Sequence, residues 1–213
     1  MRILAPIRRA ALLAAALALP VHAQIGNPAG NDPASAERPP GAPSPDALNV
    51  QDRLFIMLAS AGNLGEIAAG RLAADRSGSA RVQNFGRRMV QDHGQNRDKL
   101  AGLARSQGVP TSDAPQPDQQ AVQEWLTSLS GGSFDAAYLQ SQLIDHQKTA
   151  QLLQWEISSG QNAELKQVAM ETLPVVLDHL RMAQLLFADL TGTEPQGLAA
   201  SGMAYHDGRP DER

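Results

Sequence analysis

Apolar side chains recur every three or four residues along four long segments, and this spacing most constrains what the chain can fold into. A period of this length places the apolar residues on one side of an α-helix, so each segment is predicted to be an amphipathic helix. The sequence therefore predicts an all-α protein. The predicted helices run over about 49–74, 79–108, 134–158 and 162–190.

Residues that commonly begin and end helices flank these segments. Asn49 is the expected N-cap of the first helix, with Asp52 three residues further on. The second helix is expected to stop at Gly108, because a glycine followed by Pro110 is a common end signal. The last segment contains Pro174, which is expected to interrupt it.

The lengths of the connections predict how the helices are joined. Residues 75–78 and 159–161 are short connections, so each should join two helices into an antiparallel hairpin. The middle connection has about 25 residues, includes a short candidate helix at 118–129, and is expected to close at Gly131-Gly132. Two hairpins joined by one long crossover form the ferritin-like arrangement of a four-helix bundle. We expect residues 46–190 to form this domain.

The two ends of the chain read differently from the domain. Residues 1–23 combine a basic start, an apolar run of about ten residues and the sequence Val21-His22-Ala23, which together are typical of a secretory signal peptide. We therefore expect an exported, periplasmic protein. Residues 24–45 are rich in proline and glycine and are predicted to be a disordered leader, and residues 191–213 a disordered tail.

Composition excludes several classes of function. The chain has no cysteine, so it contains no disulfide, no thiolate metal site and no lipid-modified cysteine. Its formal net charge is −4 and it has no basic cluster, which argues against nucleic acid and anionic lipid as partners. No apolar run approaches the roughly 20 residues that a membrane-spanning helix needs. A protein partner in the cell envelope stays open, as does the oligomeric state.

Three of the five histidines directly follow an aspartate near the middle of a predicted helix: Asp92-His93, Asp145-His146 and Asp178-His179. At about 100° per residue, each ring falls on the apolar side of its helix, and Glu66 is the central polar residue on that side of the first helix. The midpoints of antiparallel helices lie at one level of a bundle, so these four side chains should converge. Glu66, His93, His146 and His179 are thus candidate ligands for Zn, Fe, Mn or Cu.

Two other readings of the same residues stay open. A buried histidine is commonly neutral and hydrogen-bonded, so the four side chains could form a metal-free polar layer that sets helix register. The rings could also lie at the bundle surface. Each aspartate lies about 100° from its histidine and is expected at the edge of the site, where it orients a ring, pairs with a neighbouring helix or faces solvent.

Small and aromatic residues carry secondary predictions. Small side chains in the first helix are expected to allow close helix packing rather than to line a ligand channel. Trp125 and Trp155 are expected in the core or as anchors of the crossover. The small residues are Gly62, Gly65, Ala69 and Gly70.

An ordered set of short motifs resembles one bacterial family. It comprises Asp52-x-x-Phe55, Gly62-x-x-Gly65-Glu66, Met89-Val90-x-Asp92-His93, Phe134-Asp135-x-x-Tyr138, Asp145-His146, and Leu173-Pro174 followed by Asp178-His179-Leu180. Over about residues 51–190 the chain is similar to the exported proteins grouped as domain of unknown function 4142. The resemblance implies a ferritin-like fold and an exported location. Members are often labelled outer membrane proteins, and the family brings no established activity.

The chain differs from di-iron ferritin-like proteins in its candidate metal ligands. Di-iron members of that fold place a glutamate three residues before a histidine on two helices. Val90 and Val176 occupy those positions here, so one central carboxylate is left and a mononuclear or vacant site is favoured.

Two functions follow from these observations. The first is a periplasmic metal-binding protein active in metal handling or stress response. The second is a non-catalytic envelope or interaction module with a metal-free core. An enzyme is disfavoured, because the chain has no Gly-x-Ser-x-Gly motif, phosphate-binding loop or cysteine nucleophile.

Overall fold

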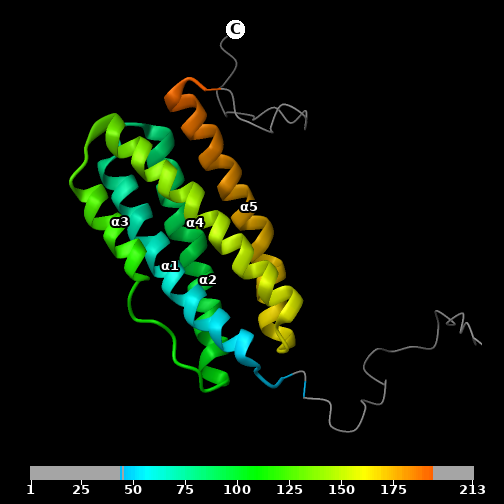
Figure 1. Ribbon diagram of the computed structural model, residues 1–213. Coiled ribbons are helices and arrows are strands. Elements are labelled where there is room, and N and C mark those ends of the chain that lie inside the picture. The colour runs from blue at the N-terminus through cyan, green and yellow to red at the C-terminus, as the bar shows by residue number, and fades with distance from the viewer. Residues whose placement is uncertain (1–43, 45, 194–213) are drawn as a thin grey trace, which may run out of the picture. The chain divides into compact units, whose positions relative to one another are not determined.

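The computed structural model describes residue 44 and residues 46–193, and within these residues it contains five α-helices and no strand (Figure 1). The predicted signal peptide at 1–23, nearly all of the leader at 24–45, and the tail from residue 194 lie outside the described residues. The helices are α1 (Val50–Arg76), α2 (Ala80–Ser106), α3 (Pro117–Thr127), α4 (Gly131–Ser159) and α5 (Ala163–Thr191).

The four long helices form a bundle of two antiparallel hairpins. Helices α1 and α2 pair along their length, as do α4 and α5, while α1 also packs on α4 and α2 on α5. The connection that contains α3 runs from the end of α2 back along the bundle, and α3 lies against α1 and α4 (Figure 1). The all-α prediction is confirmed, and the long crossover between two hairpins fits the ferritin-like prediction.

The helix ends show which local signals were decisive. The Asn49 side chain accepts a hydrogen bond from the Asp52 backbone N–H at 2.9 Å, and the Asp52 side chain accepts one from the Asn49 N–H, so the predicted N-cap is confirmed. Gly131 and Gly132 do not close the connection as predicted. They lie in the first turn of α4, where Gly131 has a positive φ of 56°.

Pro174 does not interrupt the last helix, because α5 is continuous from Ala163 to Thr191. The proline lacks an N–H, so the carbonyl one turn earlier loses its helical hydrogen bond. Pro174 lies on the exposed side of α5, where solvent is close enough to hydrate such a carbonyl.

The hydrophobic core is divided into two clusters. Residues at one end of the bundle, including Phe85, Phe134 and Tyr138, form the first cluster. Residues at the other end, including Phe55 and Leu100, form the second. Buried polar side chains occupy the level between them, since each central histidine lies in sequence between a member of the first cluster and a member of the second.

Two of the small residues on α1 allow close packing, as predicted. A Cβ on Gly70 would lie 2.7 Å from the carbonyl oxygen of Gly86, so a glycine is required where α1 crosses α2. A Cβ on Gly65 would overlap the side chain of Gln119, so the absence of a side chain at Gly65 leaves room for α3 beside α1. The crossing of α1 and α2 therefore depends on glycine at residue 70, whereas the Gln119 side chain could move to accommodate a larger residue at 65.

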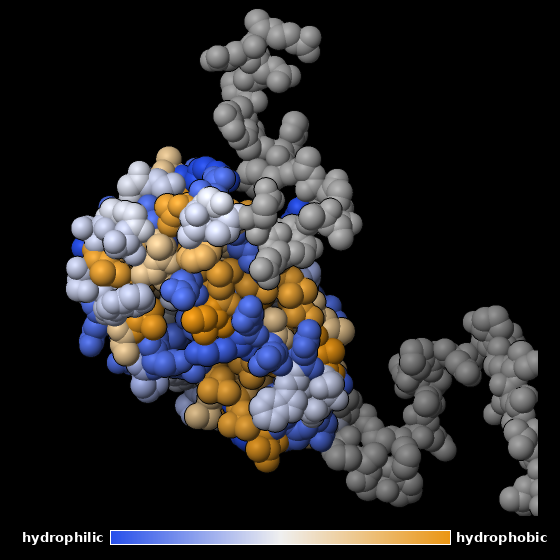
Figure 2. All heavy atoms as spheres, turned by 45° about the horizontal axis from the view of Figure 1, so that its top comes forward, coloured by the Kyte–Doolittle hydropathy of each residue, from blue (hydrophilic) through white to orange (hydrophobic). Residues whose placement is uncertain are grey.

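The prediction for the two tryptophans is wrong. Trp125 and Trp155 are about half exposed, at 50% and 52%, because both lie on outward faces of their helices. Other large apolar side chains are also exposed, and Figure 2 shows one face on which hydrophobic and hydrophilic residues are interspersed. Within the described part of the chain, no helix combines the length and apolar character needed to cross a membrane.

Candidate metal centre

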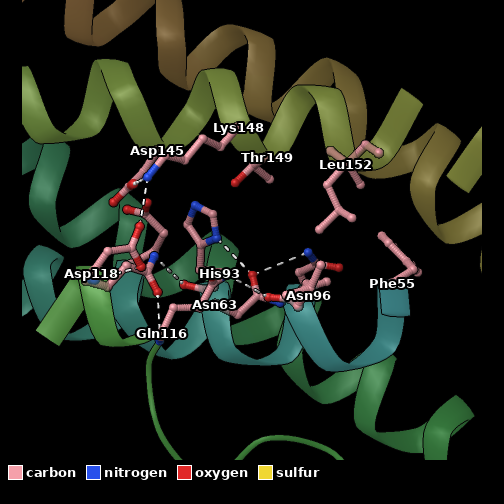
Figure 3. A pocket seen from close by; sticks show the side chains of 16 residues that line it. Phe55, Asn63, His93, Asn96, Gln116, Asp118, Asp145, Lys148, Thr149 and Leu152 are labelled. Carbon is pink, nitrogen blue, oxygen red and sulfur yellow. Dashed lines mark hydrogen bonds and ion pairs between the residues drawn. The ribbon is translucent and has the colours of Figure 1, made fainter. Parts of the chain in front are cut away.

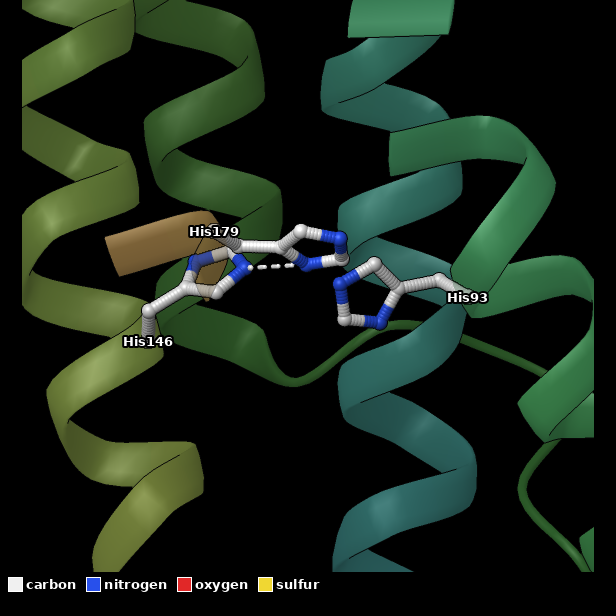
Figure 4. A group of neighbouring side chains, drawn as sticks. All are labelled: His93, His146 and His179. Atoms are coloured by element: carbon white, nitrogen blue, oxygen red, sulfur yellow. Dashed lines mark hydrogen bonds between the residues drawn. The ribbon is translucent and has the colours of Figure 1, made fainter. Parts of the chain in front are cut away.

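His93, His146 and His179 meet in the middle of the bundle (Figure 4). They come from α2, α4 and α5, and their ring centroids are 5.3 to 5.5 Å apart. Each residue is only 1% to 3% exposed, so the rings do not lie at the bundle surface. One nitrogen from each ring lies within 4.8 Å of the other two. We call these three residues the histidine triad.

One nitrogen of each ring forms a hydrogen bond with a residue outside the triad. His146 Nδ1 lies 3.0 Å from the backbone carbonyl of Gln142, one turn earlier in α4. A carbonyl oxygen only accepts hydrogen bonds, so this nitrogen carries the proton. His179 Nε2 lies 2.8 Å from a carboxylate oxygen of Asp92 and is likewise the donor.

The third ring follows the same pattern. His93 Nδ1 lies 2.9 Å from Oδ1 of Asn63, on α1. The same oxygen also accepts a hydrogen bond from Asn96 Nδ2 at 3.4 Å, which supports this orientation of the Asn63 amide. His93 Nδ1 is therefore a donor, and its Nε2 carries a lone pair directed toward the other two rings (Figure 4).

Burial keeps the three rings neutral. Desolvation and the nearby His179 ring lower the pKa of His146 to about 3, although the hydrogen bond with the Gln142 carbonyl opposes the shift. Desolvation also lowers the pKa of His93 well below its usual value, with contributions from both neighbouring rings. The pKa of His179 is lowered by burial, although hydrogen bonding to Asp92 opposes the shift. Neutral imidazole is the form that binds metal ions.

Three lone pairs therefore face one another in a buried site. His146 Nε2 and His179 Nδ1 are 3.3 Å apart, and the protons of both rings are directed elsewhere. His93 Nε2 is buried and has no hydrogen-bond partner among the described residues. Acceptors held this close repel one another, and a buried polar atom without a partner costs about 1 to 3 kcal/mol. A cation between the rings would remove both penalties.

The structure does not bring the fourth predicted ligand, Glu66, into this group. Glu66 is buried as predicted, but its Oε1 lies 3.9 Å from His146 Nδ1, on the side of the ring that faces away from the triad. Its Oε2 accepts a hydrogen bond from Gln142 Nε2 at 2.8 Å. Burial, together with the negative charge of Asp145, raises the pKa of Glu66 to about 8. A proton on this carboxyl lowers its value as a ligand.

The residue from α1 that reaches the triad is Asn63, which the sequence reasoning missed. Asn63 precedes Glu66 by three residues and lies on the same face of the helix. The signal available in the sequence was an amide one turn from the expected ligand, on the same buried face. Its oxygen orients His93 by accepting the Nδ1 proton, which is how metal-binding histidines are commonly held.

The three aspartates that precede the histidines differ in role. Asp92 orients His179 directly and also pairs with Arg88 at 3.2 Å. Asp178 pairs with the same arginine at 3.1 Å and is about half exposed. Asp145 pairs with Lys148 at 3.6 Å, beside a surface pocket. Each of these roles lies within the range that the sequence predicted.

Comparisons with known proteins support the fold and the family. Three solved structures are similar, with TM-scores of 0.57 to 0.60 and 14% to 17% sequence identity. A Streptomyces coelicolor DUF305 protein described as secreted covers 73% of this chain and 97% of its own, and a DUF305 fragment from Deinococcus radiodurans covers 67% and 98%. A Bacillus halodurans protein described as a spore coat protein covers 70% and 94%. At this identity the likeness shows the fold alone.

No functionally curated protein matches the chain. The family model described as domain of unknown function (DUF4142) matches residues 37–186, which include all three members of the histidine triad and most of the bundle. The chain therefore belongs to the DUF4142 family, which is the family that its motifs resembled.

Proposed function

We propose that the protein binds one divalent transition-metal ion at the histidine triad and acts in metal handling or stress response outside the cytoplasm. The proposal rests on the direction in which the N–H group of each ring points. All three are directed away from the centre of the triad, and three lone pairs are directed into it. Metal-binding histidines commonly have this arrangement, in which the second ring nitrogen donates to a carboxylate, carbonyl or amide.

The spacing of the nitrogens supports the same proposal. An ion at about 2.0 to 2.1 Å from tetrahedrally arranged nitrogens separates those nitrogens by about 3.3 Å. His146 Nε2 and His179 Nδ1 are 3.3 Å apart. One nitrogen of His93 lies within 4.8 Å of a nitrogen of each of the other two rings, so a small movement of the His93 ring would complete the set.

The donor set favours particular ions among those expected. Three imidazole nitrogens suit Zn, Cu or Fe better than Mn, which prefers oxygen ligands. Three protein ligands also leave a fourth coordination position for a water molecule or another small ligand. The centre would hold one ion. Glu66 lies on the outer side of the His146 ring, and among the described residues no carboxylate joins the three rings to bridge a second ion.

Export is part of the proposal. Residues 1–23 have the features of a signal peptide, and one similar structure belongs to a protein described as secreted. We propose that residues 46–190 form the functional domain in the periplasm, with 24–45 as a leader and 191–213 as a tail. Peripheral attachment to the outer membrane would fit the label often given to this family.

Metal content of untagged protein tests the proposal. We expect about one Zn(II) or Co(II) per chain by elemental analysis after dialysis, and none in His146→Ala or His179→Ala. Glu66→Gln is the informative control, because it keeps a side chain of the same shape and should still bind one ion if Glu66 is not a ligand. Equal metal content in wild type and His146→Ala would overturn the proposal.

A second candidate is the non-catalytic interaction module. The observation that favours it is a row of exposed apolar side chains on the first half of α1, at a spacing that places them on one face. A protein without bound metal that captured a specific envelope partner, and lost that partner in Met57→Glu, would support this function. The row comprises Val50, Leu54, Met57 and Leu58.

A further inference from the structure

A pocket of about 160 Å³ leads from the surface to His93 of the histidine triad (Figure 3). It lies between α1 and α4, and the start of α3 forms its rim. Glu66, Asn63 and His93, each at most 4% exposed, line the pocket. Because the triad takes its rings from α2, α4 and α5, α1 is the one long helix that supplies no ring. The pocket therefore lies on the side of the bundle that supplies no ring to the triad.

Several polar atoms among the residues that line the pocket have no partner. Asn63 Nδ2, Glu66 Oε1 and His93 Nε2 are all buried and form no hydrogen bond with any residue that the structure describes. Folded proteins pair most of their buried polar groups, because each unpaired one costs free energy. A metal ion at the triad would account for His93 Nε2, and Asn63 Nδ2 and Glu66 Oε1 are left as partners for a polar molecule in the pocket.

Gly62 accounts for much of the space. A Cβ at Gly70 would collide with the backbone of α2 and one at Gly65 with the Gln119 side chain, but a Cβ at Gly62 would meet only Gln116 Nε2, at 3.9 Å. Gly62 is therefore not required for helix packing, contrary to the sequence prediction for the small residues of this helix. Its lack of a side chain keeps the wall of the pocket open beside Asn63.

The lining also indicates the size and character of the occupant. Phe55, Ala59 and Leu153 make one part of the wall apolar, while the part at the triad is polar. A cavity of about 150 Å³ holds a ring the size of benzene in another protein, so this pocket suits a molecule of about five or six heavy atoms.

The charges at the rim argue against an anion. Asp118 and Asp145 both pair with Lys148, at 2.8 and 3.6 Å. Two carboxylates to one ammonium leave the rim with a net negative charge, which would repel an anionic ligand. Gln116 and Gln119 complete the rim, with hydrogen bonds to the backbone of α1.

We propose that this pocket binds a small neutral molecule whose nitrogen or oxygen donor occupies the fourth coordination position of the metal. The inference rests on the proposed metal site and adds to it a class of ligand and a binding pocket. The donor end meets the metal near Asn63, and the remainder of the molecule packs against the apolar wall. The ligand completes the hydrogen bonding of the inner pocket, which protein atoms leave incomplete.

The test uses the full-length protein loaded with Co(II), with imidazole as the probe. Imidazole is neutral and has five heavy atoms, and the visible absorption of Co(II) changes when its fourth ligand changes. We expect a saturable change that corresponds to one imidazole per chain. Gly62→Leu should weaken imidazole binding by at least about tenfold, because its side chain fills the pocket, and Gly62→Ala should have a smaller effect. Azide, an anion, should bind more weakly than imidazole.

Controls separate this inference from the metal site itself. Gly102→Leu adds the same side chain at an exposed position of α2 with no heavy atom within 4 Å, and should bind imidazole like wild type. Thr149→Leu fills the pocket from α4 and replaces Gly62→Leu if that variant does not fold.

Four results would overturn the inference. The inference would be wrong, and the metal site retained, if imidazole did not change the spectrum of bound Co(II). The same holds if wild type and a folded pocket-filling variant bound imidazole with equal affinity. Azide binding more tightly than imidazole would overturn the neutral class of ligand. Absence of bound Co(II) from wild type would remove both the inference and the proposed metal site.

Discussion

The protein contains two buried polar regions, and they are satisfied in different ways. The first is the histidine triad at the middle of the bundle. The second, which we call the end cluster, consists of Asp52 and Asn162, where the start of α1 meets the turn between α4 and α5. Both side chains are at most 1% exposed; Glu156 is buried beside them, but neither of its carboxyl oxygens has a hydrogen-bond partner among the described residues.

In the end cluster, the backbone supplies the partners. One oxygen of Asp52 accepts hydrogen bonds from the N–H groups of Gln161 and Asn162, both at 3.0 Å, and the other caps α1. Asn162 in turn caps α5 by accepting from the Leu165 N–H at 3.0 Å. These contacts join three helix ends, so the end cluster is structural.

In the histidine triad, protein atoms form hydrogen bonds only with the ring nitrogen that faces away from the centre of the triad. The inner nitrogens face one another, and His93 Nε2 has no partner within the described residues. The difference teaches that burial of polar groups does not by itself indicate function. A polar group that the fold itself satisfies holds the fold together, while converging atoms that the fold leaves unsatisfied indicate a ligand.

The largest expected effect tests the structural half of this comparison. Asp52→Ala removes the side-chain half of the capping box of α1 and leaves the N–H groups of Gln161 and Asn162 without their acceptor, which should lower the free energy of unfolding by about 4 kcal/mol. Urea unfolding of the metal-free protein measures this change. Asp98→Ala, at an exposed position on α2, is the control and should change stability by less than about 0.5 kcal/mol. A loss below about 1 kcal/mol for Asp52→Ala would contradict the structural role.

The next effect tests whether the hydrogen bond that orients a triad ring contributes to metal binding. Asp92 and Asp178 both pair with Arg88, but only Asp92 bonds to a triad ring. Asp92→Ala should weaken Co(II) or Zn(II) binding by about 10- to 100-fold, because His179 loses the acceptor that orients it. Asp178→Ala should leave metal affinity unchanged in the same competition titration. Equal losses in the two variants would show that the effect comes through the arginine.

The smallest effect concerns the dependence of stability on pH. Burial raises the pKa of Glu156 to about 8, and the neighbouring carboxylate of Asp52 adds to the shift. The folded protein thus keeps a proton that the unfolded chain releases near pH 4.5. The stabilisation is complete below that pH and is lost as the pH rises toward about 8.

Glu156→Gln isolates this contribution, because glutamine is neutral at every pH. Wild type should lose stability between pH 6 and pH 9, and Glu156→Gln should lose less, by on the order of 1 kcal/mol. Part of the decline should remain, since burial also raises the pKa of Glu66 to about 8. Urea unfolding at the two pH values measures the difference, with Glu124→Gln, at an exposed position of α3, as the control. Identical pH profiles in wild type and Glu156→Gln would refute this account.

Much of the fold could be predicted because its signals are local. The apolar period located the four long helices, and Asn49 with Asp52 marked the start of α1. The predicted break at Pro174 failed because a proline on the exposed side of a helix can be tolerated there. Trp125 and Trp155 failed for a related reason, since residue type alone does not say which side of a helix meets the core.

The candidate site could be predicted only in part. Three rings near the midpoints of antiparallel helices had to lie at a similar level, and the structure brings all three together. Glu66 was assigned to the same level, but it lies beside His146 on the outer side, and Asn63 reaches the triad instead. A difference of one helical turn decided which side chain of α1 enters the group, and helical periodicity places both residues on the same face.

The sequence by itself determined the helices, their hairpin connections and the height of the three histidines, because apolar period and connection length act locally along the chain. Only the tertiary structure decided which ring nitrogen points inward, because that choice depends on Asn63 and Asp92, acceptors held on other helices. Their positions follow from the packing of distant segments, which no local pattern encodes.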